Sequence, residues 1–345
     1  MATTRERSLK RYAPRPNHQH SSLEAFEAQD VVEPGVHTIA AGESTVDLLL
    51  DENGDADTLL VFFPSAVTPE ITWPFFQGAD AAKTLGLSLL AISDPTIARS
   101  AKIRTGWTLG DDRYWLHHDM TRYIDAVSRG RRLLFVGASA GGFPALYYGS
   151  MYPDSITVAI NPRTHLFAPP THLQIDPSRQ FGDVPVSAIP DLVPVRAGSP
   201  GNTVVYLQNS GDHRYFAGHM IPYLHRAEPG ARIWTRMGHW GTGHKTPPKE
   251  FLHRVLGTLA GPKSFEHAVR ALRLQPFSDV DELLMEQATI SVSVHRNRRL
   301  TLEAREAGRA ASPGQRPART WSERLRLRRG QSWRNRLRRF RSSRS

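Results

Sequence analysis

Apolar-rich segments with the length of β-strands recur along the first 262 residues, and segments with helical spacing lie between them. A strand that is covered on both faces reads as a nearly continuous apolar run. Alternation of such strands with helices predicts an α/β fold, with a mostly parallel, doubly wound sheet and helices on both of its faces. The expected strands are VDLLLD (46–51), TLLVFFPSA (58–66), LSLLAISDP (87–95), RLLFVG (132–137), SITVAINP (155–162), TVVYLQNSGD (203–212) and ARIWTRMG (231–238).

Four further segments have the features of helices. MTRYIDAVSRG ends on a glycine, which commonly follows a helix, and PPKEFLHRVLGTLA begins with proline, which suits a first helical turn. The turn residues ENGDAD predict a tight connection between the first two strands. The expected helices are 75–86, 120–130, 143–153 and 247–260.

The rest of the chain shows where the pattern stops. Residues 1–30 are polar and weakly patterned, and we expect a flexible N-terminal arm before a domain that spans 31–262. The segment 163–202 is rich in Pro, Asp and Ser, which predicts a small cap or lid inserted over the sheet. Residues 263–303 form a C-terminal extension with one helix (SFEHAVRALRLQ) and one short strand (TISVSVHR), and 304–345 read as a linker and an arginine-rich tail.

The formal charge of +11 comes entirely from the C-terminal tail. Residues 316–345 hold twelve arginines and one glutamate, which leaves 32 basic and 32 acidic side chains in the remainder. The absence of cysteine excludes disulfides, a cysteine nucleophile and cysteine-ligated zinc. The N-terminus lacks the apolar core of a secretory signal, and no apolar run has the length of a membrane span. We therefore expect a cytoplasmic protein.

A glycine-rich sequence around Ser139 carries the main chemical signal. GASAG has the pattern G-x-S-x-G, between the strand RLLFV and the helical segment FPALYYG. In that context the pattern predicts a nucleophile elbow, a sharp turn that exposes the serine hydroxyl. Gly137 and Gly141 avoid clashes at the turn, and the backbone N–H of Ala140 is then free to donate to an oxyanion.

A serine nucleophile needs a base and an acid that orients the base. In this type of fold the chain order is Ser, then Asp or Glu, then His. Asp212 follows one predicted strand in NSGD, and His244 follows the next in GHWGTGH. Both residues should therefore lie at the edge of the sheet that carries the serine. His239 is the alternative base, and Asp183 and Asp191 are weaker alternatives for the acid.

A second oxyanion donor is expected in the turn after the strand TLLVFFPSA. Because Pro64 has no N–H, we assign this role to the backbone amide of Ser65 rather than to that of Ala66. The sequence HHD at 117–119 is not accompanied by further ligands at a suitable spacing, so no metal site is predicted.

GASAGG, with Asp212 and His244 downstream, resembles the α/β-hydrolase family over about residues 45–262. Three segments are more narrowly similar to bacterial relatives associated with capsule and other surface polysaccharides, some of which are sugar O-acetyltransferases. These segments are SDPTI (93–97), GASAGGFPALYY (137–148) and NPRT (161–164). The resemblance implies an acyl-enzyme mechanism that uses Ser139, Asp212 and His244.

We therefore expect a serine esterase that needs no cofactor and acts on a small-molecule or glycan ester. The alternatives are an O-acetyltransferase of surface polysaccharide biosynthesis, with an acyl donor such as acetyl-CoA, and an inactive binding factor tethered by its tail. In the tail, Trp333, Leu337 and Phe340 share one helical face among arginines. Such a helix suits an anionic inner membrane surface or an acidic polymer, and no specific nucleic acid is expected.

Overall fold

The computed structural model describes residues 4–53, 57–167, 176–190, 193, 202–227, 230–277, 302–304 and 306. The chain divides into two compact units, Met1–Leu300 and Thr301–Ser345. The predicted tail helix (316–345) and the short strand predicted after residue 288 lie outside the described residues.

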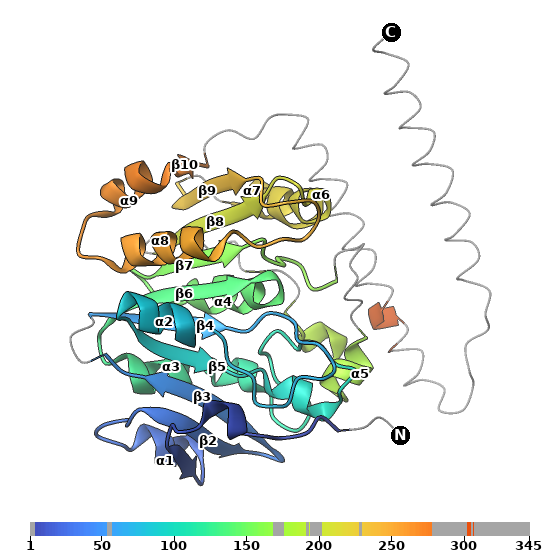
Figure 1. The fold of residues 1–345 in the computed structure, drawn as a ribbon. Helices are drawn as coiled ribbons and strands as arrows, with labels where there is room; N and C mark the ends of the chain where they lie inside the picture. The colour runs from blue at the N-terminus through green and yellow to red at the C-terminus, as the bar shows by residue number, and fades with distance from the viewer. Residues whose placement is uncertain are drawn as a thin grey trace. The chain divides into compact units, whose positions relative to one another are not determined.

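The first unit contains one ten-stranded sheet in the order β1-β2-β3-β5-β4-β6-β7-β8-β9-β10 (Figure 1). The six strands from β5 to β9 in this order run parallel, and β3 is antiparallel to both β2 and β5. The mostly parallel sheet confirms the predicted α/β class. The strands are β1 (Asn17–His20), β2 (Gly35–Ala41), β3 (Ser44–Asp51), β4 (Thr58–Phe63), β5 (Ser88–Ile92), β6 (Arg132–Ala138), β7 (Ile156–Ile160), β8 (Thr203–Asn209), β9 (Ile233–Gly238) and β10 (Gln275–Pro276).

Helices cover both faces of the sheet (Figure 1). One apolar core lies between the sheet and α2 (Ala79–Leu85), α8 (Lys249–Ala260) and α9 (Phe265–Leu272). The other lies beneath α1 (Leu23–Glu27), α3 (Met120–Ser128) and α4 (Gly142–Gly149). All six residues of β4 are buried, and the side chains of residues 59–63 enter the two cores alternately.

The predicted tight connection between the first two expected strands does not make them neighbours. β5 lies between β3 and β4, antiparallel to the first and parallel to the second. The fully buried and mostly apolar sequence of β5 favours this interior position, and α2 supplies the crossover that a parallel strand requires.

The prediction of a flexible arm over residues 1–30 is wrong for residues 4–30. β1 pairs in parallel with β2, and Tyr12 is buried in the core. Arg5 is only 4% exposed, and its guanidinium donates to backbone carbonyl groups of two loops. The polar sequence did not indicate this packing, because Arg5 is held by backbone carbonyl oxygens rather than by apolar side chains. The acceptors are the carbonyl oxygens of Thr68, Pro69, Ile71, Ile97, Ala101 and Ile103.

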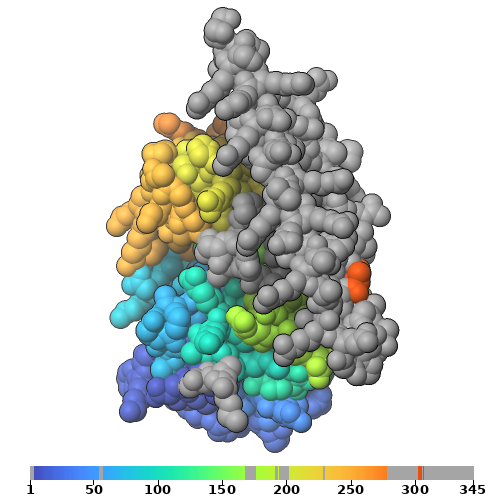
Figure 2. Space-filling view, turned by 90° about the vertical axis from the view of Figure 1, so that its right-hand side faces the viewer, coloured from blue at the N-terminus to red at the C-terminus, as the bar shows by residue number. Residues whose placement is uncertain are grey.

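The described part of the predicted cap packs against a loop that follows β5. It contains α5 (Pro177–Phe181), in which Phe181 is fully buried beside Trp107. Figure 2 shows this segment, in yellow-green, beside the teal segment around residue 110. Two further helices, α6 (His213–Tyr215) and α7 (Ile221–His225), follow β8. No helix in the described parts of the chain has the length and apolarity needed to cross a membrane.

Candidate active site

Ser139 occupies a strained turn between β6 and α4. Its φ of 53° lies in the left-handed region, which a serine adopts only where the surrounding structure enforces it. A Cβ added at Gly137 would lie 2.0 Å from the Gly141 carbonyl oxygen. A Cβ added at Gly141 would lie 2.5 Å from the Phe63 carbonyl oxygen. The glycines are therefore required by close backbone contacts, and this strand–turn–helix geometry is that of a nucleophile elbow.

Asp212 and His244 form a close pair at the ends of β8 and β9. His244 Nδ1 lies 2.5 Å from Asp212 Oδ2, and Asp212 is only 3% exposed. The other carboxylate oxygen accepts the backbone N–H of Tyr215 at 3.2 Å. The carboxylate therefore holds Nδ1 as the protonated ring nitrogen, which leaves Nε2 as a proton acceptor.

The alternative residues lie elsewhere. His239 is exposed, and its Nδ1 is 3.5 Å from Ser210 Oγ, whereas Asp212 pairs with His244. Asp183 lies on the cap segment, where its backbone N–H donates to Asp112 Oδ2. Asp191 lies outside the described residues.

Two buried asparagines, which the sequence analysis missed, fix the loop that carries His244. Asn209 bridges four backbone groups: its Nδ2 donates to the carbonyls of Gly241 and Gly243, and its Oδ1 accepts from the amides of Gly211 and Trp240. Asn161 Nδ2 donates to the Lys245 carbonyl, and Asn161 Oδ1 accepts a hydrogen bond from the backbone N–H of Asn209. The sequence did contain a signal for these two residues, because each asparagine is a polar side chain at the end of an apolar strand.

The two predicted oxyanion donors have different positions. Ala140 lies in the single turn η4 (Ser139–Gly141), where backbone N–H groups have no acceptor within the helix. The Ser65 N–H instead donates to Gln77 Oε1 at 2.7 Å, and the Ser65 hydroxyl reaches the same oxygen. Ser65 is therefore not a free donor in this structure, because a side chain twelve residues away satisfies its amide.

Two further residues lie against the elbow and the histidine. The Arg163 backbone N–H donates to the Ser139 carbonyl at 2.8 Å, and the Arg163 guanidinium lies 5.2 Å from the Trp107 ring. The Tyr215 ring stacks on the His244 imidazole, with ring centroids 3.9 Å apart. A direct Ser139–His244 hydrogen bond is not among the contacts of the described residues, and such bonds commonly tighten only when substrate binds.

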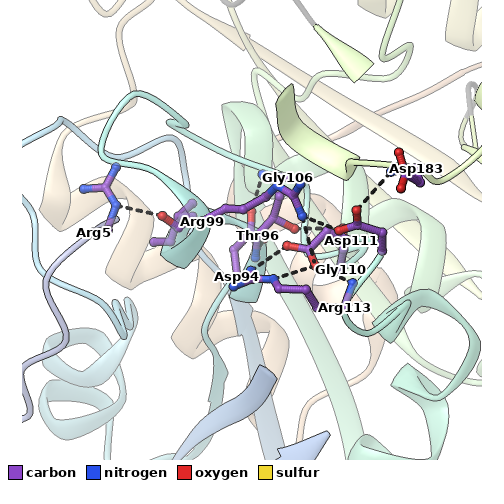
Figure 3. A network of polar contacts seen from close by, with 11 residues as sticks. Arg5, Asp94, Thr96, Arg99, Gly106, Gly110, Asp111, Arg113 and Asp183 are labelled. Carbon is purple, nitrogen blue, oxygen red and sulfur yellow. Dashed lines mark hydrogen bonds and ion pairs between the residues drawn. The ribbon is translucent and has the colours of Figure 1, made fainter. Parts of the chain in front are cut away.

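Asp94, in the SDPTI segment, holds the neighbouring loop together (Figure 3). It follows β5 and accepts the backbone N–H groups of Thr96 and Gly106, while the Thr96 hydroxyl donates to the Gly110 carbonyl. Burial raises the pKa of this carboxyl, and these hydrogen bonds oppose that rise. Its contacts give Asp94 a structural role.

The HHD segment has aromatic neighbours. The ring nitrogens of His117 lie 3.4 Å from the hydroxyls of Tyr147 and Tyr148. Within the parts of the chain that the structure describes, no group of three or more potential ligands is arranged to hold a metal ion.

No family model and no curated protein matches this sequence. Among solved structures, similarity extends to the capsule O-acetyltransferase of Neisseria meningitidis serogroup A, with 13% identity, 68% of this chain and 96% of the other covered, and a TM-score of 0.45. The carboxylesterase CesB of Bacillus subtilis has 13% identity to this chain, with 70% of this chain and 96% of the other covered and a TM-score of 0.42. The serine hydrolase XC6422 of Xanthomonas campestris has 14% identity, with 70% of this chain and 95% of the other covered and a TM-score of 0.38. The sheet topology and serine elbow of this structure show, independently of these similarities, that the chain has the α/β-hydrolase fold.

Proposed function

We propose that this protein is a serine-nucleophile acyl-ester hydrolase that forms an acyl-enzyme. The observation that carries the proposal is the pair formed by the buried Asp212 and the partly exposed His244, at the edge of the sheet where Ser139 occupies a strained elbow. A carboxylate that orients an imidazole, together with an exposed serine, is the arrangement that activates a hydroxyl for acyl transfer.

In this mechanism Ser139 Oγ attacks the ester carbonyl and passes its proton to His244 Nε2. Asp212 fixes the tautomer of His244 and stabilises the imidazolium, and the Ala140 N–H donates to the oxyanion. The leaving alcohol takes the proton from His244 as the acyl-enzyme forms. Water then attacks the acyl carbonyl and gives a proton to His244. His244 returns this proton to Ser139 Oγ as the acyl–Oγ bond breaks, which releases the acid and restores the free serine.

Transfer of the acyl group to a sugar hydroxyl is the second candidate, with an acyl donor such as acetyl-CoA. It is favoured by the positions of the three segments that resemble polysaccharide-associated relatives. SDPTI, GASAGG and NPRT follow β5, β6 and β7, so all three lie at the edge that carries the proposed site. A sugar hydroxyl would then replace water in the second step.

Labelling with a fluorophosphonate probe tests the proposed nucleophile. Wild type should be labelled on Ser139, and Ser139→Ala should not be labelled. His244→Ala should abolish turnover of a chromogenic acetyl ester, whereas His239→Ala is a matched control that should retain it. Undiminished labelling of Ser139→Ala would refute the assignment, and inactivity of the wild type in both assays would favour the binding factor.

Hydrolysis and transfer are separated by mass spectrometry of the acyl-enzyme. A hydrolase should lose the adduct at the same rate with and without sugar acceptors. Faster loss with a sugar, with appearance of the acylated sugar, would establish the transferase instead.

A further inference from the structure

Tyr215 touches all three residues of the proposed triad. It ends α6, three residues after Asp212, and its backbone N–H donates to Asp212 Oδ1 at 3.2 Å. Its ring lies on the His244 imidazole, with an interplanar angle of 28°. Its hydroxyl lies beside the Ser139 side chain. The backbone, ring and hydroxyl of one residue therefore each face a different member of the triad.

The Tyr215 hydroxyl is buried, and among the described residues it makes no hydrogen bond of standard distance and angle. The residue is 3% exposed, and its hydroxyl is close enough to the Ser139 side chain for that side chain to lower the phenol pKa. A buried hydroxyl normally has a partner, because leaving it unsatisfied costs free energy. A buried donor beside a nucleophile is therefore available to a substrate atom bound there.

The surroundings of this hydroxyl favour a hydrogen-bond donor. Burial raises the pKa of the Tyr215 phenol above its ordinary value, so the phenol keeps its proton at neutral pH. The positive charge of Arg163 acts in the opposite direction, because it stabilises negative charge near the phenol oxygen. Arg163 is itself held at the elbow, where its backbone N–H donates to the Ser139 carbonyl. A developing oxyanion would thus meet a neutral donor and a nearby cation.

A second oxyanion donor is needed because the Ser65 amide already donates to Gln77. We propose that Tyr215 is a catalytic residue whose hydroxyl donates a hydrogen bond to the substrate acyl oxygen during attack by Ser139. This inference rests on the proposed acyl-enzyme mechanism. As the Oγ–carbon bond forms, the carbonyl electron pair moves to the acyl oxygen and the serine proton moves to His244. Tyr215 keeps its own proton throughout.

Tyr215→Phe tests this role, because it removes the hydroxyl and keeps the ring on His244. Loss of one oxyanion donor typically lowers kcat by 10²–10³-fold. We therefore expect kcat for a chromogenic acetyl ester to fall by about 10²-fold, with KM changed by less than about threefold. The fluorophosphonate labelling rate should fall in parallel. The midpoint of thermal unfolding should not decrease, because the variant loses an unsatisfied buried hydroxyl.

Tyr223→Phe is the matched control. Tyr223 is also buried, at 6% exposure, and its hydroxyl is likewise without a hydrogen-bond partner in the described residues. Its ring packs beside Tyr206, with centroids 5.6 Å apart. Removal of this hydroxyl should leave kcat and the labelling rate within about twofold of wild type.

Three outcomes are distinguishable. A fall in kcat and labelling for Tyr215→Phe alone, with unchanged unfolding, supports the inference. An active wild type whose Tyr215→Phe variant keeps kcat within twofold overturns the inference and leaves the proposed function standing. A wild type that neither turns over esters nor labels at Ser139 overturns the proposed function, and the inference with it.

Discussion

We predict that acid weakens the attachment of the N-terminal segment, because His37 becomes protonated. His37 is 1% exposed and lies on β2, which pairs with β1. Three hydrogen bonds define a relay of neutral groups. Gln29 Nε2 donates to His20 Nδ1, His20 Nε2 donates to His37 Nδ1, and His37 Nε2 donates to the Glu33 carbonyl. Because both nitrogens of His37 are committed, a proton added at Nδ1 would place it against the N–H of His20.

The magnitude follows from the pKa of His37. Burial is the largest cause that lowers this pKa from 6.5 to about 4, and protonated His18 and His20 act in the same direction. Between these two values the unfolded chain binds a proton at the imidazole and the folded chain does not. The free energy of unfolding therefore falls as the pH falls from 6.5 towards 4, and no further loss from this group occurs below that range. At pH 4.5 the loss is about 2.5 kcal/mol.

Urea unfolding at pH 7 and 4.5 of wild type and His37→Gln measures this contribution. Glutamine retains one donor and one acceptor but does not titrate, so the variant should lose about 2.5 kcal/mol less than wild type between these pH values. His239→Gln, at an exposed turn, controls for general effects of removing a histidine and should lose as much as wild type. Equal losses in wild type and His37→Gln would refute the relay.

Three further predictions concern the loop, the N-terminal segment and the tail. Asn209→Ala should lower esterase kcat at least tenfold and the free energy of unfolding by about 2–4 kcal/mol, because His244 loses its loop anchor; unchanged kcat would contradict this. Arg5→Met should lower the free energy of unfolding by about 3–5 kcal/mol in urea, because several buried carbonyls lose their donor, and an unchanged midpoint would contradict the observed packing. A chain that ends at Pro313 should stop cosedimenting with anionic vesicles and keep its esterase activity, since we propose that the tail binds anionic surfaces and the triad precedes it; equal binding or lost activity would refute this.

The sequence alone determined seven of the ten strands and the position of the candidate serine. Strand runs such as TLLVFF are apolar on both faces, and that pattern has few stable solutions other than an interior parallel strand. The glycines around Ser139 encode the elbow locally, because only residues without Cβ fit its backbone contacts. The candidate roles of Asp212 and His244 also followed from sequence, since each residue lies in the loop that follows a strand.

Tertiary structure alone decided which partners these residues meet. The pairing of His244 with Asp212, the capture of the Ser65 amide by Gln77, and the position of Tyr215 on His244 all join residues from different elements. Local periodicity carries no signal for such contacts, because they depend on loop closure and on side-chain rotamers that packing selects. The same reason explains the N-terminal segment. Its polar sequence resembles a free arm, but the carbonyl groups that bind Arg5 converge only when two distant loops fold together.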